Sequence, residues 1–188
     1  MSSHSTPSQT VGPFFSIGLE PLNRANLVEG CAGERVVIHG RIIDGEGQGV
    51  PDAIVEIWQA DADGRYHHPE HAGATNGVTS FIGFGRIPTD AQGQFSFTTI
   101  KPGPVHGPDG KPHAPHLQIT VFMRGLLRQL VTRLYFPDEP LNSSDPVLQV
   151  VPESRRETLI ARQMGPKQNA LEWNVCLQGA NETVFFDC

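Results

Sequence analysis

The sequence contains few cysteines, and none of them has a partner at metal-binding spacing. The three cysteines, Cys31, Cys176 and Cys188, lie far apart and form no CxxC motif. Disulfide frameworks and structural zinc sites both need cysteines in pairs or close groups, so an odd and scattered set argues against either. We therefore expect free, reduced thiols, as in a cytoplasmic protein.

A basic surface and long apolar segments are missing as well. The formal net charge is −6, which disfavours nucleic acid as a partner because phosphate binding needs a basic face. No apolar run approaches the ~18 residues of a membrane span. The N-terminal stretch MSSHSTPSQT has neither the basic nor the apolar region of a secretory signal. We expect a soluble cytoplasmic protein that binds neither membrane nor nucleic acid.

The chain does contain many turn residues, which separate short β-strand patterns. Its 20 glycines and 16 prolines lie between segments in which apolar and polar residues alternate. This arrangement predicts an all-β domain at 34–188, an antiparallel sandwich or barrel, with one short helix at 152–164. The expected strands are 34–43, 53–59, 94–100, 117–123, 130–136, 171–177 and 183–186.

Residues 1–33 form an arm that precedes this domain. Three prolines, Pro7, Pro13 and Pro21, exclude a long helix in it. Its segment TVGPFFSIGL is nevertheless too apolar for a solvated tail. We expect this extended arm to pack on its own domain or on a partner chain. The long, irregular loop at 61–88 is expected to line a site or an interface.

Histidines are the candidates for metal binding. One group lies in the polar loop YHHPEH, and a second group precedes or opens the strand at 117–123. Imidazole suits iron, zinc and copper, so an independent metalloenzyme is one hypothesis. Its candidate ligands are His67, His68, His71, His106, His113 and His116. The stretch ADADG lacks the spacing of a calcium-binding EF-hand loop and predicts an Asx-turn.

Two arginines deserve separate predictions. Arg124 follows an apolar strand and precedes Gly125, a position from which a guanidinium can bind a carboxylate with two hydrogen bonds. A solvated or salt-bridged surface arginine is the alternative. Arg133 lies in the middle of a strand, where a structural ion pair is expected. The residues alone reveal no complete active site.

Several stretches then fall into one pattern. In chain order they are TPSQTVGPFFSIGL, VEIWQADADGRY, TTIKPGP, PHAPHLQITVF, RLYFPDEP and ETVFFD, and they cover almost the whole sequence. In these stretches the chain resembles the intradiol ring-cleavage dioxygenases. The resemblance implies a β-sandwich enzyme that uses a non-haem ferric ion held by two tyrosines and two histidines.

The resemblance also implies a reaction and an assembly. In this family a catecholate binds the ferric ion through both oxygens, and dioxygen opens the ring between the two hydroxylated carbons. The branch that this chain resembles converts protocatechuate to 3-carboxy-cis,cis-muconate in the β-ketoadipate pathway of aromatic-compound degradation. It is built from homologous α and β chains in a higher αβ oligomer, and the iron belongs to the β chain.

Most of the family's iron ligands are absent from this chain. His116 stands at the first position of the family's H-x-H pair, and Gln118 replaces the second. Catalytic chains carry a tyrosine directly after KPGP, where this chain has Val105. The other ligand tyrosine is missing too, because none occurs between Tyr66 and Tyr135, which match structural tyrosines of the family. We expect no catalytic residue and no metal ligand set here, with Fe(III) bound by the partner β subunit.

The resemblance gives this chain a part in the wall of the partner's substrate pocket. Thr10, Gly12, Pro13 and Phe14 match arm residues that border the cavity, although Phe14 replaces a tyrosine often found there. Arg124 matches an arginine near the substrate's carboxylate. These residues are the expected substrate-binding set, and the arm is expected to pack on the partner chain. A non-catalytic β-sandwich that serves in binding or assembly is the alternative.

Overall fold

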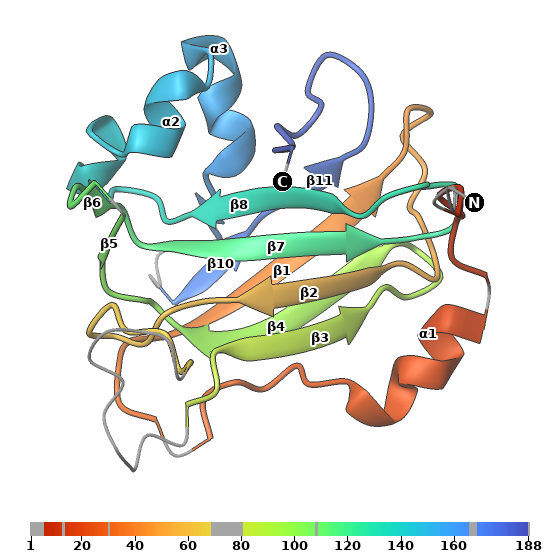
Figure 1. Ribbon diagram of the computed structural model, residues 1–188, viewed down its shortest axis with the longest axis horizontal. Helices are drawn as coiled ribbons and strands as arrows, with labels where there is room; N and C mark the ends of the chain where they lie inside the picture. Colours follow the sequence, from red (N-terminus) through yellow and green to blue (C-terminus); the bar gives the residue numbers. More distant parts are fainter. Residues whose placement is uncertain are drawn as a thin grey trace, which may run out of the picture.

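Two β-sheets form the body of the protein (Figure 1). The first is built on β1 (Arg35–Ile43), which pairs antiparallel with β4 (Gln94–Ile100) along one edge. Along its other edge β1 pairs in parallel with β10 (Ala170–Glu172) and then with β11 (Val175–Cys176), and β9 (Arg162–Gln163) pairs with β10. The computed structural model describes residues 6–12, 14–29, 31–68, 81–107, 109–165 and 169–187.

The second sheet has the strand order β3–β2–β7–β8, and all of its neighbours are antiparallel. The strands are β2 (Ile54–Trp58), β3 (Phe84–Pro88), β7 (His116–Phe122) and β8 (Leu130–Tyr135). A two-stranded ribbon of β5 (Val105–His106) and β6 (Pro112–His113) precedes β7. In Figure 1, β7 begins at the end of the sheet near this ribbon and ends at the opposite side, near the N-terminal arm.

The two sheets bury a common hydrophobic core between them. Leu117, Ile119 and Val121 of β7 are fully buried in it, on the face that the alternating sequence predicts. Ile38 and Phe97 of the first sheet belong to the same cluster. Burying one such side chain stabilises the fold by about 1.5–3 kcal/mol, so a one-residue slip of β7 would cost several of them at once.

Short helices lie beyond β8, at the free edge of the second sheet (Figure 1). They are the 3-10 helix η2 (Pro140–Ser143), α2 (Pro146–Val150), α3 (Glu153–Arg156) and the 3-10 helix η3 (Glu157–Leu159). Leu148 and Leu159 pack here on Tyr135 in a second buried cluster. Within the described residues, no helix has both the length and the apolar character that crossing a membrane requires.

Most of the expected strands are confirmed. β1, β2, β4, β7 and β8 coincide with the predicted segments to within one residue at each end. The segment 171–177 is divided into β10 and β11, and 183–186 makes a single bridge, between Phe186 and Val131. The prediction of purely antiparallel sheets is wrong at β10 and β11, and β3 lies inside the loop expected at 61–88.

The helix expected at 152–164 is wrong in length. Its first half forms α3 and η3, but Ile160 is already extended and β9 follows. Leu159 is fully buried whereas Met164 is 46% exposed, so these residues do not share one buried helical face. Pairing of β9 with β10 overrides a weak helical pattern. The sequence pattern also does not predict α1 (Phe14–Leu19) or α2, which are too short to show a helical period.

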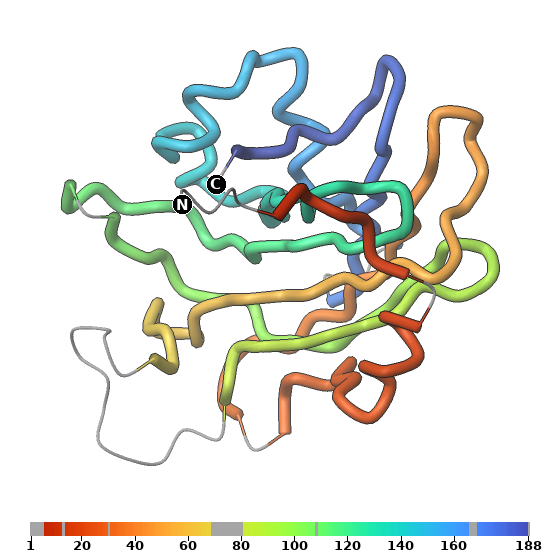
Figure 2. Tube along the Cα trace, turned by 45° about the vertical axis from the view of Figure 1, so that its right-hand side comes forward, coloured from red at the N-terminus to blue at the C-terminus, as the bar shows by residue number. Residues whose placement is uncertain are grey.

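The arm contacts its own domain, which is one of the two alternatives expected for it; the other is packing on a partner chain. The Gly125 amide donates a 2.7 Å hydrogen bond to Thr10 Oγ1, and the Phe15 ring lies 5.6 Å from that of Phe122. Further along, arm residues form bridges to β3 and β4. The arm is not extended throughout, because it contains α1 and the 3-10 helix η1 (Glu20–Leu22). Figure 2 shows it beside the end of β7.

A buried carboxylate joins the helical layer to the second sheet. Asp145 is fully buried and caps α2, where its Oδ1 accepts hydrogen bonds from the amides of Val147 and Leu148, each at 2.9 Å. The same oxygen accepts a 3.0 Å bond from the Tyr135 hydroxyl, and Oδ2 accepts a 2.9 Å bond from the Ala114 amide. Four donors therefore depend on this one side chain.

Asp145→Ala is expected to lower the free energy of unfolding by about 3 kcal/mol, because it leaves several buried donors without an acceptor. Urea unfolding followed by circular dichroism measures the loss. Asp90→Ala is the matched control, since Asp90 also accepts two backbone hydrogen bonds but is exposed. The control is expected to lose less than about 1 kcal/mol. Equal losses in the two variants would contradict a special role for Asp145.

Candidate functional site

One face of the second sheet points away from the core and carries polar and aromatic side chains. The strand register places Trp58, Gln118 and Arg133 in a row across β2, β7 and β8. His116 and Tyr135 form the neighbouring pair on β7 and β8. Because side chains two residues apart on a strand lie on the same face, all five share this outer surface. The residues that match the family's H-x-H pair therefore lie beside Arg133.

His116 is buried on this face and is neutral at physiological pH. It is 6% exposed, and its Nδ1 lies 2.7 Å from the carbonyl oxygen of Ala114, so Nδ1 carries the proton and donates it. Burial, and after it the positive charge of Arg133, lowers the pKa of His116 to about 4. The imidazole is consequently a fixed, uncharged group with its lone pair on Nε2.

Arg133 lies between His113 and the tyrosine that donates to the buried carboxylate. Its Nη1 donates a 3.3 Å hydrogen bond to the Tyr135 hydroxyl and lies 3.5 Å from His113 Nδ1. Tyr135 in turn donates to Asp145, and His113 Nδ1 is 3.6 Å from Asp145 Oδ2. The structural ion pair expected for Arg133 is not seen among the described residues, where Arg133 contacts Tyr135 and His113. Its guanidinium meets a hydroxyl and an imidazole, and reaches the carboxylate through Tyr135.

The two tyrosines of the chain are kept protonated by burial. Burial raises the pKa of Tyr135, against a smaller opposing effect of Arg133. Burial likewise raises the pKa of Tyr66, whose ring stacks on Trp58 with centroids 5.8 Å apart and planes inclined by 10°. A metal ligand must be a phenolate, so both tyrosines suit the structural role that the family resemblance assigns them.

Arg124 lies at the opposite end of β7. Its Nη2 lies 3.0 Å from Oδ2 of Asp52, and the two side chains are 54% and 52% exposed. Asp52 occupies the turn before β2 with a φ of 61°, in the left-handed region that aspartate adopts more readily than most residues. An ion pair this exposed contributes about 0–1 kcal/mol to stability. It orients the guanidinium without removing it from solvent.

The arm residues of the expected substrate-binding set lie beside this arginine or follow closely in sequence. Thr10 is bonded to Gly125, the residue after Arg124. Gly12 is exposed, and Phe14 is exposed by 78%. Pro13 lies outside the described residues. A cavity of about 150 Å³ opens between the arm and the end of β7, and its lining residues are Gln9, Val11, Phe122, Met123, Leu126, Leu127, Arg128 and Gln129.

The residues around His116 and those around Arg124 lie far apart. His116 is the first residue of β7, and Arg124 follows its last residue by two positions. At about 3.3 Å per residue, their backbones are roughly 25 Å apart. Arg124 therefore does not act on a ligand held at His116 of the same chain.

The hypothesis of a histidine-based metal site finds no support in the described part of the chain. No three histidine, cysteine, aspartate or glutamate side chains gather closely enough there to hold a metal ion. His67, His68 and His106 are exposed, while His113 and His116 belong to the network around Arg133. His71 lies outside the described residues.

Two smaller predictions are confirmed. Asp61 Oδ1 accepts hydrogen bonds from the backbone amides of Asp63 and Arg65, each at 2.9 Å. This is the Asx-turn expected for ADADG. Cys31 and Cys176 are free thiols. The third cysteine lies outside the described residues.

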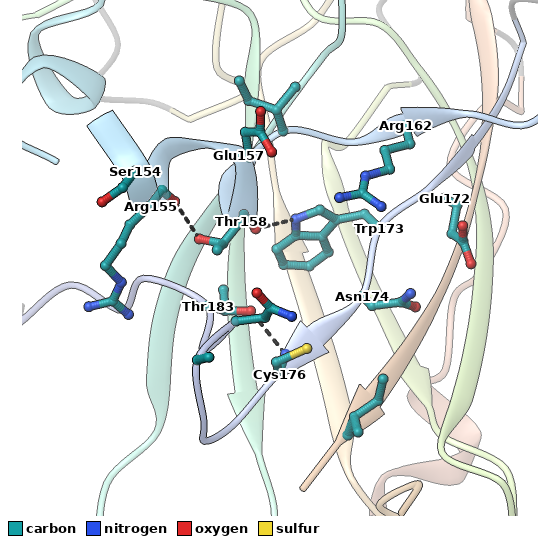
Figure 3. Close-up of a pocket in the computed structure, with 14 residues that line it drawn as sticks. Ser154, Arg155, Glu157, Thr158, Arg162, Glu172, Trp173, Asn174, Cys176 and Thr183 are labelled. Carbon is teal, nitrogen blue, oxygen red and sulfur yellow. Dashed lines mark hydrogen bonds between the residues drawn. The ribbon is translucent and has the colours of Figure 1, made fainter. Parts of the chain in front are cut away.

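A pocket of about 330 Å³ lies elsewhere, between the helical layer and the C-terminal strands (Figure 3). Its polar groups bond to one another: Trp173 Nε1 donates to the Thr158 carbonyl at 3.1 Å, and Thr158 Oγ1 donates to the Arg155 carbonyl at 2.8 Å. The Cys176 amide donates to Thr183 Oγ1 at 2.9 Å. These bonds satisfy the groups that they join, and the same pocket is also lined by Glu157, Arg162, Glu172 and Asn174.

The chain belongs to the dioxygenase family whose model matches residues 12–179, and within it to the intradiol ring-cleavage enzymes. It is 40% identical to the protocatechuate 3,4-dioxygenase alpha chain of Burkholderia cepacia, over 97% of this chain and 96% of that one. The alpha chain of Pseudomonas putida is 41% identical over the same shares of the two chains. The beta chain of Burkholderia cepacia is 40% identical over 69% of this chain and 56% of its own length.

Solved structures agree on the fold. The dioxygenase domain of a dioxygenase–carbohydrate-binding protein fusion from Streptomyces sp. SirexAA-E matches with a TM-score of 0.62 and 25% identity, over 84% of this chain and 89% of that one. An intradiol ring-cleavage dioxygenase from Tetranychus urticae matches with a TM-score of 0.65 and 19% identity, over 86% and 90%. The expected intradiol dioxygenase fold is thereby supported at the level of its strands and sheets.

Intradiol dioxygenases are iron enzymes, and the residues of this chain do not fit an iron ion. Gln118 offers a neutral amide, a weak ligand for ferric iron. Val105, 9% exposed, offers no ligating atom at all. His116 has only Nε2 left after its bond to Ala114, and the guanidinium of Arg133 adds a positive charge beside it. The described residues at these positions therefore do not form a ligand set for iron.

The sequence does not single out two residues of these sites, Asp145 and Asp52, and for Arg133 it suggests only a structural ion pair. Arg133 lies two positions before Tyr135, so period-two alternation along the strand was a usable signal for its place on the outer face. Asp145 and Asp52 come from a helix cap and a turn that are distant in sequence from their partners. Nothing in the local pattern indicates which strand end each will meet.

Acid is expected to destabilise the protein through His116. Its neutral form is favoured in the fold, so between pH 6.5 and about 4 the unfolded chain takes up a proton that the folded chain does not. The contribution of His116 to the free energy of unfolding is fully present above pH 6.5. It decreases by about 3 kcal/mol as the pH approaches 4. Urea unfolding at a series of pH values should show a smaller loss in His116→Gln. The exposed His39→Gln is the control, and a loss unchanged in His116→Gln would refute this origin.

Proposed function

We propose that this chain is the α subunit of a protocatechuate 3,4-dioxygenase, inactive by itself and active with a homologous β subunit that binds the Fe(III). The near full-length identity to two such alpha chains supports this proposal, together with the lost ligand set. The complex would cleave protocatechuate with dioxygen between its hydroxylated carbons, in the cytoplasm, as part of aromatic-compound degradation. We also propose that the two sheets have the sandwich arrangement of this family.

The position of Arg124 is the observation that carries the proposal. It lies roughly 25 Å from the residues that match the family's ligands in its own chain. It is half exposed, and it sits beside the arm rather than in a closed cavity. An arginine so placed can serve an active site only if another chain completes that site. This is the geometry expected of a subunit that supplies one wall of its partner's pocket.

Arg124 would bind the carboxylate of protocatechuate. A guanidinium offers two parallel donors that match the two oxygens of a carboxylate, and covering the site with a second chain would strengthen the interaction by excluding water. Asp52 holds the side chain in place before substrate arrives. Catechol lacks the carboxylate and would gain nothing from this contact, so Arg124 would favour the carboxylated substrate.

The N-terminal arm would supply the contact with the β subunit. Phe14 is 78% and Ile17 61% exposed, and α1 has no buried residue. Exposing apolar side chains on a short surface helix to water is unfavourable, and covering them with another chain removes this cost. We propose that residues 1–33 pack on the partner, with Thr10, Gly12, Pro13 and Phe14 bordering the shared pocket in a higher αβ oligomer.

Expression of the chain with and without its β subunit tests the assignment. The isolated chain is expected to show neither the visible absorption of tyrosinate bound to ferric iron nor ring-cleavage activity. Both should appear in the complex, with the iron content matching the number of β chains. Stoichiometric iron and activity in the isolated chain would overturn the proposal.

Arg124→Ala in the complex is expected to raise the KM for protocatechuate roughly tenfold or more, because a charged hydrogen-bond donor to the carboxylate is lost. Turnover of catechol should change much less. The KM of Arg124→Lys for protocatechuate should lie between those of the natural complex and Arg124→Ala, since lysine keeps the charge without the paired donors. Steady-state oxygen uptake measures all of these.

Arg128→Ala is the matched control for this experiment. It removes another exposed arginine from the same link after β7 and lines the neighbouring cavity. Its KM for protocatechuate should stay close to that of the natural complex. An unchanged KM in Arg124→Ala would leave the chain with an assembly function alone.

A further inference from the structure

We propose that the guanidinium of Arg133 has taken the place of the metal ion in this chain, so that this one residue keeps the former iron site closed to metals even when ligands are restored. The proposal concerns the outer face of the second sheet. It is independent of what Arg124 does at the other end of β7.

The positions that match family ligands converge on Arg133. Gln118 is its direct cross-strand partner in the register of β7 and β8. Val105 pairs with His113, whose Nδ1 lies 3.5 Å from Arg133 Nη1. The charge of Arg133 also acts on His116. Residues from β6, β7 and β8 thus lie around a single cationic group, and Val105 of β5 is the strand neighbour of one of them.

The guanidinium also performs an electrostatic task that a metal ion could perform. Asp145 is a fully buried carboxylate, and a buried charge is costly unless an opposite charge balances it. Arg133 supplies that charge through the Tyr135 hydroxyl, by hydrogen bonds of 3.3 and 3.0 Å. A metal ion bound close to Arg133 would add like charge to a site that is already compensated.

An ordinary structural arginine is the competing explanation. Arginines on the outer face of a sheet commonly extend their charged end into water and stabilise neighbours by packing. Such a residue would not decide whether metal binds. The two explanations differ in one measurable respect, which is the metal affinity of a chain whose ligands have been rebuilt.

The test is made on the full chain with Val105→Tyr and Gln118→His together, which we call the rebuilt chain. It is compared with the rebuilt chain that also carries Arg133→Gln. Co²⁺ is titrated into each, and its affinity is measured by competition with a coloured chelator. We expect the Arg133→Gln form to bind Co²⁺ at least tenfold more tightly. Equal affinities, or no binding by either form, would overturn the proposal.

Two further variants separate charge from volume and from net charge. The rebuilt chain with Arg133→Lys keeps a cation and should exclude Co²⁺ as arginine does; tight binding by it would refute the electrostatic argument. The rebuilt chain with Arg128→Gln loses the same formal charge at the far end of β7 and should bind no better than the rebuilt chain. Urea unfolding checks that each variant is folded. If Val105→Tyr prevents folding, the same comparison is made with Gln118→His alone.

Discussion

The alternation of side chains along β7 is the constraint on which both sites depend. One set of residues, Leu117, Ile119 and Val121, is fully buried between the sheets and fixes the register of the strand. The other set, which includes His116 and Gln118, is thereby committed to the outer face. The same strand delivers Arg124 to the surface at its far end. A single registered strand thus places the residues that match the family's iron ligands and the proposed substrate contact at a fixed separation.

The strands of the core could be predicted from the sequence because burial imposes a period of two on their residues. β4 was predicted at its observed bounds, and four other strands to within one residue. Elements fixed by pairing rather than by pattern were not predictable. β3 lies inside a segment expected to be a loop, and β9 is only two residues long, too short to show a period. The segment 171–177 was predicted as one strand, but its division into β10 and β11 was not. The parallel edge of β1 depends on where the C-terminal segment returns, which no local signal records.

The sites show the same division. His116, Gln118 and Arg124 could be singled out because each lies in or next to a strand whose alternation is visible in the sequence. The acidic residues near them were not predictable: Asp145, which accepts from Tyr135, belongs to a helix cap, and Asp52, which pairs with Arg124, belongs to a turn. The outer face of the second sheet also shows a polar group that is held together by its own hydrogen bonds. The carboxylate, tyrosine and arginine form a connected hydrogen-bonded group there, and its stability needs no bound ion.

The turn at Asp52 restricts the amino acids that can follow β1 in this surface. A residue held at φ 61° is comfortable there only as glycine, asparagine or aspartate. These three differ in charge and hydrogen bonding but hardly in the backbone they allow. Evolution can therefore adjust the electrostatic environment of Arg124 in single steps without disturbing a strand. The charge beside Arg124 can thus change independently of the residues that fold the protein.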